Sequence, residues 1–206
     1  PTQSLDSMLG TNSPVYEIYG AANWLINPAV ADTTILTLNQ DTNGVGGMLV
    51  NDAATRAITA VANGVITIGT NGGTIGATTN TILTIPQAVA LGANRLTIGS
   101  TNYLDRVLVP KLGVVLLTAA NGYNTALPGS SITIVPGACL TNALNSIPDA
   151  ADIVVNGTFG LAAADTLGSL AGSGTVNVGA NLTVGRNNNA TTYSGALTGA
   201  SALTKT

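Results

Sequence analysis

The sequence is short of the side chains that catalysis and metal binding use most. Its 206 residues include no histidine, one cysteine, one tryptophan and one phenylalanine, and charged residues make up only 7%, where an ordinary soluble domain has about a quarter. Without histidine there is no Ser-His-Asp or Cys-His arrangement, and the commonest metal ligand is missing. The single Cys139 can form neither an intrachain disulfide nor a structural zinc site, and we expect it to be a small buried apolar residue.

The charges that are present form no basic surface in the sequence. Six basic and nine acidic residues give a net charge of −3, and the basic residues are scattered along the chain. Nucleic-acid binding requires a basic stripe that neutralises phosphates, so the sequence predicts no nucleic-acid partner. Thr, Asn and Gly interrupt every apolar run well before the roughly 18–20 residues of a membrane-spanning helix. We therefore expect no membrane insertion by this chain.

Small aliphatic and small polar residues fill the rest of the sequence. The hydrophobic fraction of 45% argues against disorder, and the 25 glycines show no period of three that would indicate collagen. After residue 33, apolar residues alternate with Thr or Asn, which predicts strands with one buried face. These strands are expected at residues 34–38, 64–69, 81–85, 95–99, 113–118, 131–135, 152–156, 174–179 and 181–185.

Two architectures fit such strands, an antiparallel sandwich and a parallel β-solenoid. A sandwich core normally uses bulky aromatics, whereas a solenoid stacks small and β-branched residues in a narrow interior. The composition favours the solenoid. With about 20 residues per turn and about 4.8 Å per rung, we expect eight or nine rungs and a height of roughly 40 Å. Asn-Gly pairs beginning at residues 43, 63, 71, 121 and 156 predict turns with positive φ.

The N-terminal region differs from the rest, because Tyr16, Tyr19 and Trp24 are three of only seven aromatic residues. The spacing of apolar residues over 13–26 favours a short amphipathic helix, although residues 15–19 also fit a strand. We expect residues 1–32 to form a helical or irregular cap, or a docking segment, and residues 33–206 to form the solenoid.

The C-terminal half contains a glycine-rich strand, an "LTVG" strand, a "YSG" strand and a closing "LTK" element at residues 166–179, 181–185, 192–195 and 203–206. This order resembles the autotransporter-associated β-strand repeat family, and the segments at 113–123 and 131–140 are similar to that family as well. The resemblance is good from about residue 113 to 206 and weaker from 33 to 112. The resemblance implies a right-handed parallel β-helix on a bacterial surface, commonly the passenger stalk of a type V secreted protein. It implies no enzymatic activity.

Few residues in the sequence are candidates for catalysis or ligand binding. The glycine clusters at 44–47 and 72–76 lack the Asp that binds calcium in nonapeptide repeats, and no P-loop is present. Polysaccharide cleavage, argued from fold analogy, would need paired carboxylates. Asp149 and Asp152 are close in sequence, and Asp165 could lie about one rung away. We favour turn or strand-entry roles for Asp149 and Asp152, and a solvated loop for the charged residues between 105 and 111. The sequence thus predicts no catalytic residue, cofactor or metal site.

Three functions remain open. The first is a non-enzymatic structural or adhesive extracellular surface protein, with a host or matrix surface as partner. The second is a filament subunit that stacks end to end with copies of itself, and the third is a polysaccharide-active enzyme. Residues 186–190 form a polar insertion that could contact a glycan or protein, or be only a turn. The candidate self-association or cap residues are Tyr16, Tyr19, Trp24, Leu203 and Thr204.

Overall fold

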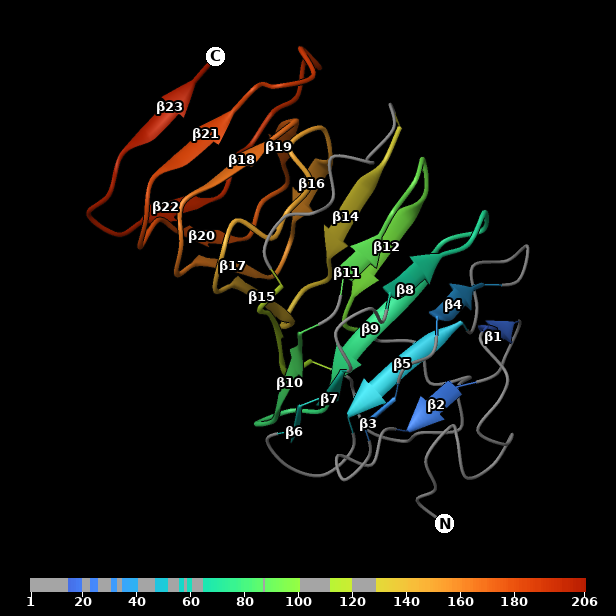
Figure 1. The fold of residues 1–206 in the computed structure, drawn as a ribbon. Coiled ribbons are helices and arrows are strands. Elements are labelled where there is room, and N and C mark those ends of the chain that lie inside the picture. The colour runs from blue at the N-terminus through green and yellow to red at the C-terminus, as the bar shows by residue number, and fades with distance from the viewer. Residues whose placement is uncertain are drawn as a thin grey trace.

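The computed structural model is a stack of parallel strands that coil into an all-β solenoid of about six turns (Figure 1). It describes residues 37–40, 47, 65–86, 88–100, 112–119 and 129–206 with their side chains. It also describes the backbone of the strands at 15–19, 23–25, 31–32, 35–36, 48–51, 56–57 and 59–60. No helix occurs among these residues. The predicted parallel β-solenoid is confirmed.

The first face of the solenoid is a seven-stranded parallel sheet. From the N-terminal end its strands are β2 (Asn23–Leu25), β5 (Met48–Asn51), β9 (Gly73–Ala77), β12 (Arg95–Ile98), β14 (Ser131–Ile134), β16 (Asp152–Val155) and β19 (Ser169–Ala171).

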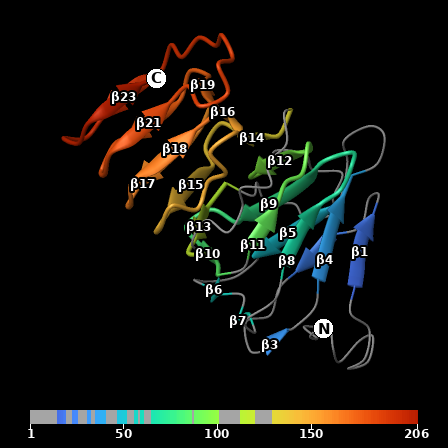
Figure 2. The same cartoon turned by 45° about the horizontal axis from the view of Figure 1, so that its top comes forward.

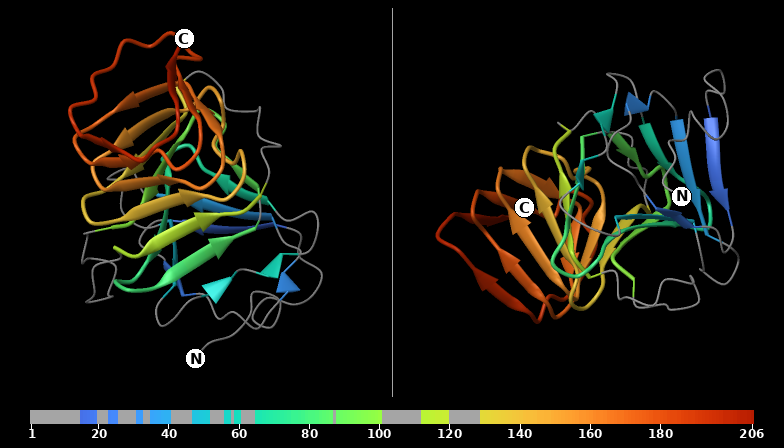
Figure 3. Two further views of the ribbon diagram at one scale, coloured as in Figure 1. Left: turned by 90° about the vertical axis from the view of Figure 1, so that its left-hand side faces the viewer. Right: turned by 90° about the horizontal axis from the view of Figure 1, so that it is seen from below.

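The second face is another seven-stranded parallel sheet. Its strands, in the same direction, are β6 (Arg56–Ala57), β10 (Ile82–Ile85), β13 (Val114–Leu117), β15 (Cys139–Asn142), β17 (Thr158–Leu161), β20 (Thr175–Asn177) and β22 (Ala196–Thr198). The left view of Figure 3 shows the strands stacked from the N-terminal end to the C-terminal end.

The third face has two separate parts at opposite ends of the stack (Figure 2). The N-terminal part contains β1 (Val15–Tyr19), β4 (Ile35–Asn39), β8 (Val65–Ile68) and β11 (Ala88–Ala90), and the C-terminal part contains β18 (Asp165–Leu167), β21 (Leu182–Val184) and β23 (Leu203–Lys205). A small parallel pair joins β3 (Ala31–Asp32) to β7 (Thr59–Ala60).

The core consists of columns of apolar side chains that run along the solenoid. On the second face Leu83, Val115, Leu140, Phe159 and Val176 occupy the same position in successive strands, and each is fully buried. Burying one such side chain stabilises the fold by about 1.5–3 kcal/mol. Each rung therefore depends on the rungs above and below it for most of its burial.

The number of turns is smaller than the sequence predicted, because the rungs differ in length. Asp152 pairs with Ser169 in the next rung, 17 positions later in the sequence, whereas Arg95 pairs with Ser131, 36 positions later. Turns of about 20 residues occur at both ends, but longer rungs lie between them, and the solenoid has about six turns, so the prediction of eight or nine rungs is wrong.

The helix expected over residues 13–26 is also wrong. Residues 15–19 form β1, which pairs in parallel with β4, and residues 23–25 form β2, which pairs with β5. The strand alternative for 15–19 is therefore correct. Apolar spacing in so short a segment fits both periods, and pairing with a neighbouring strand decides between them. The boundary at residue 32 remains a prediction.

At one corner of the C-terminal rungs the neighbouring backbone leaves no room for a side chain, and glycines occupy these positions. Gly157, Gly174 and Gly195 each precede a strand of the second face. A Cβ atom on Gly174 would lie 2.1 Å from the carbonyl oxygen of Gly157, and one on Gly195 would lie 2.1 Å from that of Gly174. The predicted positive φ is found at Gly72, at +91°, but not at Gly157. At Gly157 the close approach of the backbone explains the residue. The Asn-Gly pairs that begin at 43, 63 and 121 lie outside the described residues.

Candidate functional site

In the described part of the chain, a dense group of hydrogen bonds on the outer surface surrounds Asp152. This residue begins β16, and on the first face it lies between Ser131 and Ser169 of the adjacent rungs. Its Oδ1 atom accepts a hydrogen bond from Ser169 Oγ. We refer to Asp152, Ser169, Asn187, Asn189 and the carbonyl group of Ala150 as the Asp152 cluster.

Two asparagines of the polar insertion complete this cluster. Asn187 Nδ2 donates to Asp152 Oδ1 at 2.8 Å and to the carbonyl oxygen of Ala150 at 3.2 Å. Asn189 Nδ2 donates to Asp152 Oδ1 at 3.1 Å and to Oδ2 at 3.0 Å. The insertion at 186–190 is thus fastened to a strand about 35 residues earlier in the chain. The sequence indicated an exposed insertion but not its contact with Asp152.

Local backbone geometry brings the insertion onto the first face. Gly185 follows β21 with a φ of +120°, and Asn188 has a φ of 58°, so the chain turns twice within four residues. A Cβ atom on Gly168 would lie 2.5 Å from Asn187 Nδ2. The absence of a side chain at Gly168 therefore leaves the space that Asn187 occupies.

The hydrogen bonds also determine the charge of Asp152. Burial raises the pKa of this carboxyl group, but the donors Ser169, Asn187 and Asn189 together outweigh that effect and lower the pKa below its ordinary value. Asp152 therefore carries its negative charge at neutral pH.

Asp165 is a second highly hydrogen-bonded carboxylate, but it points into the solenoid. It is only 4% exposed. Its Oδ2 atom accepts hydrogen bonds from Asn142 Nδ2 at 2.7 Å and from the backbone N–H groups of Ser146 and Ile147 at 3.1 Å, while Oδ1 accepts one from Thr166 N–H at 2.9 Å. Burial raises the pKa of Asp165 to about 6, more than these hydrogen bonds lower it.

Asn142 explains why a carboxylate is buried here. It lies in a core column between Leu117 and Leu161 and is fully buried. Its Oδ1 accepts a hydrogen bond from Ala162 N–H, and its Nδ2 donates to Ala163 O and to Asp165. A buried polar group must have partners, so Asn142 and Asp165 satisfy each other and hold the 143–147 turn.

The carboxylates considered for polysaccharide cleavage occupy separate faces. The residue that pairs with Asp152 in the next rung is Ser169, whereas Asp165 pairs with Leu182 on the third face. Asp149 lies in the turn closed by the hydrogen bond from Ala151 N–H to Pro148 O, as predicted for a turn residue. Asp152 is the first residue of β16, which confirms its strand-entry role. The charged residues between 105 and 111 lie outside the described residues.

The candidate self-association residues lie in strands at the two ends of the stack. Tyr16, Tyr19 and Trp24 belong to β1 and β2, but their side chains lie outside the described part of the structure. Leu203 and Thr204 are in β23, where Leu203 is 45% exposed although its column neighbour Leu182 is 1% exposed.

The sequence did not identify a further exposed residue of this last rung. Leu197 in β22 is 48% exposed, while Val176, its partner in β20, is fully buried. Only the pairing of β22 with β20 shows that Leu197 continues a core column. Nothing in the sequence distinguishes Leu197 from the small residues around it.

Cys139 differs from the expectation of a buried residue. It is half-buried and free, and it occupies an outward position of β15 between Val114 and Thr158. Burial raises the pKa of its thiol more than the hydrogen bond with Thr141 lowers it. The thiol is therefore mainly protonated at neutral pH.

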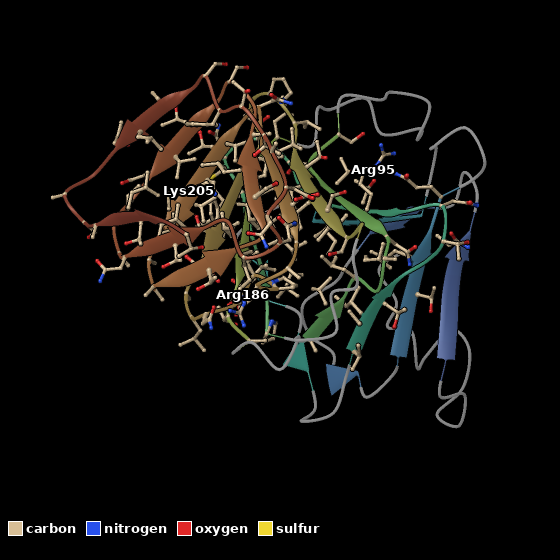
Figure 4. The ribbon with its side chains drawn as sticks, turned by 90° about the horizontal axis from the view of Figure 1, so that it is seen from above. Arg95, Arg186 and Lys205 are labelled. Carbon is tan, nitrogen blue, oxygen red and sulfur yellow. The ribbon has the colours of Figure 1, made fainter. Side chains whose placement is uncertain are left out.

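No concentrated charge or metal-ligand cluster is found in the described part of the chain. Arg95, Arg186 and Lys205 lie apart from one another (Figure 4). Among the described residues, no three His, Cys, Asp or Glu side chains gather where they could hold a metal ion. The same part of the chain contains no helix long and apolar enough to cross a membrane.

Comparisons with known proteins add no relative: no family model matches the chain, and no curated protein or solved structure matches it either.

Proposed function

We propose that this chain is a non-enzymatic structural segment of an extracellular bacterial surface protein, a β-solenoid stalk or passenger that projects or presents binding surfaces. The resemblance of residues 113–206 to the autotransporter-associated repeat supports the bacterial surface as its location. The partner in this proposal is a host or matrix surface.

The continuous core columns are the observation that carries this proposal. On the first face Ile75, Ile98, Ile134 and Val155 follow one another in register, and each is fully buried. Because the two seven-stranded sheets join successive rungs by hydrogen bonds along the first and second faces, we expect the molecule to resist bending and stretching along its axis. A rod of this kind suits a spacer between a cell surface and its surroundings.

The described carboxylates support a structural role as well. A carboxylate that cleaves a glycosidic bond must reach the substrate. Asp165 is almost fully buried, and the Asp152 carboxylate already accepts hydrogen bonds from Ser169, Asn187 and Asn189. Both side chains connect rungs or turns to one another.

Surface display tests this proposal. The chain is fused to a secretion signal and an outer-membrane translocator, with an epitope at its N-terminus, and intact cells are treated with protease. We expect an accessible epitope on a chain that resists a protease concentration that digests the Phe159→Ala variant. Equal digestion of both chains contradicts the proposed rigid stalk. Release of reducing sugar from a polysaccharide, lost on Asp149→Ala or Asp152→Ala, contradicts the non-enzymatic assignment.

A second candidate function is a filament subunit in which strands β22 and β23 pair with a neighbouring chain. Strands β22 and β23 end their sheets, and Leu197 and Leu203 lie exposed on them at positions that are buried in the preceding rung. Unpaired strand edges can pair with another chain. In negative-stain microscopy the filament function predicts fibres that disappear when residues 1–32 are deleted. Monodisperse short rods from the whole chain contradict it.

A further inference from the structure

The N-terminal half of the second face carries apolar side chains on its outer surface. Ile82 of β10 is 36% exposed, and Val114, Leu116 and Cys139 of β13 and β15 are partly exposed at outward positions. The register places Ile82, Val114 and Cys139 in one column and Leu116 in the column beside it. We call these four side chains, which lie on three adjacent strands, the apolar patch.

The C-terminal half of the same face is different in the same two columns. Its outward positions hold small or polar residues, namely Thr158, Gly160, Thr175, Asn177, Ala196 and Thr198. Small and polar residues are ordinary on a surface in contact with water, whereas apolar side chains gathered on one surface mark a place where another segment or molecule packs. The change along the face therefore indicates that only its N-terminal half is covered.

The connection that leads into the apolar patch is longer than the others at the same corner. The chain passes from the first face to the second in four residues at 78–81 and 135–138, but in 15 residues at 99–113. Both ends of this long connection are fixed to the preceding rung, because Gly99 N–H donates to Ile75 O at 2.8 Å and Gly113 N–H donates to Ala77 O at 2.6 Å. The corner itself needs four residues, so the 11 residues 101–111, which lie outside the described residues, are additional.

The additional segment is rich in apolar residues and ends beside the apolar patch. Its large apolar residues are Tyr103, Leu104, Val107, Leu108 and Val109. The residue that follows the segment, Leu112, packs against the core and is only two positions before Val114 of the patch. Apolar surface gains free energy when it is removed from water, so the segment and the patch can each bury apolar surface against the other.

We propose that residues 101–111 pack on the apolar patch and cover it. The other outer surface at this corner belongs to the first face, where Thr97 and Thr133 offer the segment little apolar contact. A second copy of the chain fits the patch less well, because three strands span only about 10 Å along the stack, whereas a stable interface buries about 800 Å² on each partner.

This proposal does not rest on the proposed surface function, because it concerns how one connection packs on one face of the solenoid. It also limits where a partner can bind on the second face. The half that begins at Thr158 stays open, while the apolar patch is already occupied.

The rate at which a maleimide labels Cys139 measures the cover directly, because this residue belongs to the apolar patch and is the only cysteine of the chain. Deletion of residues 101–111 leaves Gly99, Ser100, Leu112 and Gly113 at the corner, the same length as the corners at 78–81 and 135–138. We expect the shortened chain to stay folded, as judged by circular dichroism. Its Cys139 should be labelled about tenfold faster than that of the original chain, because the thiol no longer waits for a local opening.

A second variant keeps the full length of the chain in case the shortened chain does not fold. It combines five substitutions, Tyr103→Ser, Leu104→Ser, Val107→Ser, Leu108→Ser and Val109→Ser, and should raise the labelling rate of Cys139 in the same direction. The matched control is Thr175→Cys in a Cys139→Ser chain, two rungs further along the same column. Its labelling rate should change by less than about twofold when either variant is introduced.

An unchanged labelling rate at Cys139 in the folded variants overturns the proposal. An equal rise at Thr175→Cys also overturns it, because it would show a general loosening of the second face. So does a labelling rate of Cys139 in the original chain that falls as the protein concentration rises, because a second copy of the chain would then be the cover.

Discussion

An aspartate on the outer face of the solenoid and one in its interior have pKa values shifted in opposite directions. Asp152 on the outer face and Asp165 in the interior are separated by 13 positions in the sequence, and each is held by several hydrogen bonds. Yet the pKa of Asp152 is lowered, whereas that of Asp165 is raised to about 6. On the outer face the hydrogen bonds outweigh desolvation and lower the pKa, whereas in the interior desolvation outweighs the hydrogen bonds and raises it.

Uncharged side chains also differ between the interior and the outer face. Along β17 the exposure alternates, so that Phe159 is fully buried between Leu140 and Val176 while Thr158 beside it is exposed. Interior positions are constrained by the rungs on both sides. Outward positions are constrained only by their neighbours on the same face, which is why Ser, Thr, Asp and Cys can follow one another there.

The largest expected effect is therefore at Phe159. Phe159→Ala should lower the free energy of unfolding by about 3–5 kcal/mol, because it removes a large side chain from the middle of a core column and leaves a cavity. Thr158→Ala on the same strand should change it by less than about 0.5 kcal/mol. Urea denaturation followed by circular dichroism measures both values. Similar losses for the two variants would show that β17 does not have one buried face.

The next effect is the pH dependence that Asp165 contributes. Its pKa of about 6 in the folded chain lies above its ordinary value of 3.8, so the folded state binds the proton more tightly than the unfolded state. Its contribution to stability is fully present below pH 3.8 and is lost as the pH rises through 6, by roughly 3 kcal/mol.

Comparison of the original chain with Asp165→Asn isolates this contribution. Between pH 4 and 7 the original chain should lose stability relative to the variant, as measured by urea denaturation at each pH. A difference that does not vary with pH would contradict the raised pKa. Asp152 should show the opposite sign: its contribution is present above its ordinary pKa and is lost as the pH falls through the lowered value in the folded chain.

A smaller effect is expected at the glycine corner. Gly174→Ala should destabilise the fold by about 1–3 kcal/mol, since the new Cβ would lie 2.1 Å from Gly157 O and the rungs must move apart. Gly160→Ala is the control, because its Cβ would meet nothing closer than Thr141 Oγ1 at 3.2 Å. Thermal unfolding of the two variants tests this, and an equal Tm would show that the corner is not tightly packed.

The smallest effect concerns the connection between the insertion and the first face. Asp152→Asn should cost roughly 1 kcal/mol, because partly exposed hydrogen bonds contribute little net stability. The loss should be local, so amide hydrogen exchange should speed up at residues 186–190 and not in β14. Faster exchange in both places would indicate a global role for Asp152.

The pattern of single residues predicted nine of the strands of the solenoid body, and the others, such as β9, β15 and β17, were not among those predicted. Alternation such as Ile132-Thr133-Ile134 placed β14 and its buried face correctly, and each of the nine predicted segments overlaps a strand. The scarcity of aromatics correctly favoured a parallel solenoid over an antiparallel sandwich. Periodicity was insufficient at residues 15–25, where spacing that suits a helix is found in two short strands.

Features that depend on register could not be predicted. Asn142 and Asp165 lie in the interior because variable rung lengths bring residues 23 positions apart into contact. The same variation aligns Ser169 and the 186–190 insertion with Asp152. A strand of alternating residues shows which side chains face inward, but not which residues of other rungs they meet.

In the solenoid each position stacks on the same position of the next rung, and Cys139 allows a direct test of this stacking. Thr158 pairs with Cys139, and Thr175 pairs with Thr158 one rung further away. Neighbouring strands lie about 4.8 Å apart, so two rungs span about 10 Å. A one-carbon bis-methanethiosulfonate reagent should therefore crosslink Cys139 to Thr158→Cys within one chain, and leave the Thr175→Cys variant uncrosslinked. Equal crosslinking of the two variants, or crosslinking of Thr175→Cys alone, would contradict the stacking of the rungs.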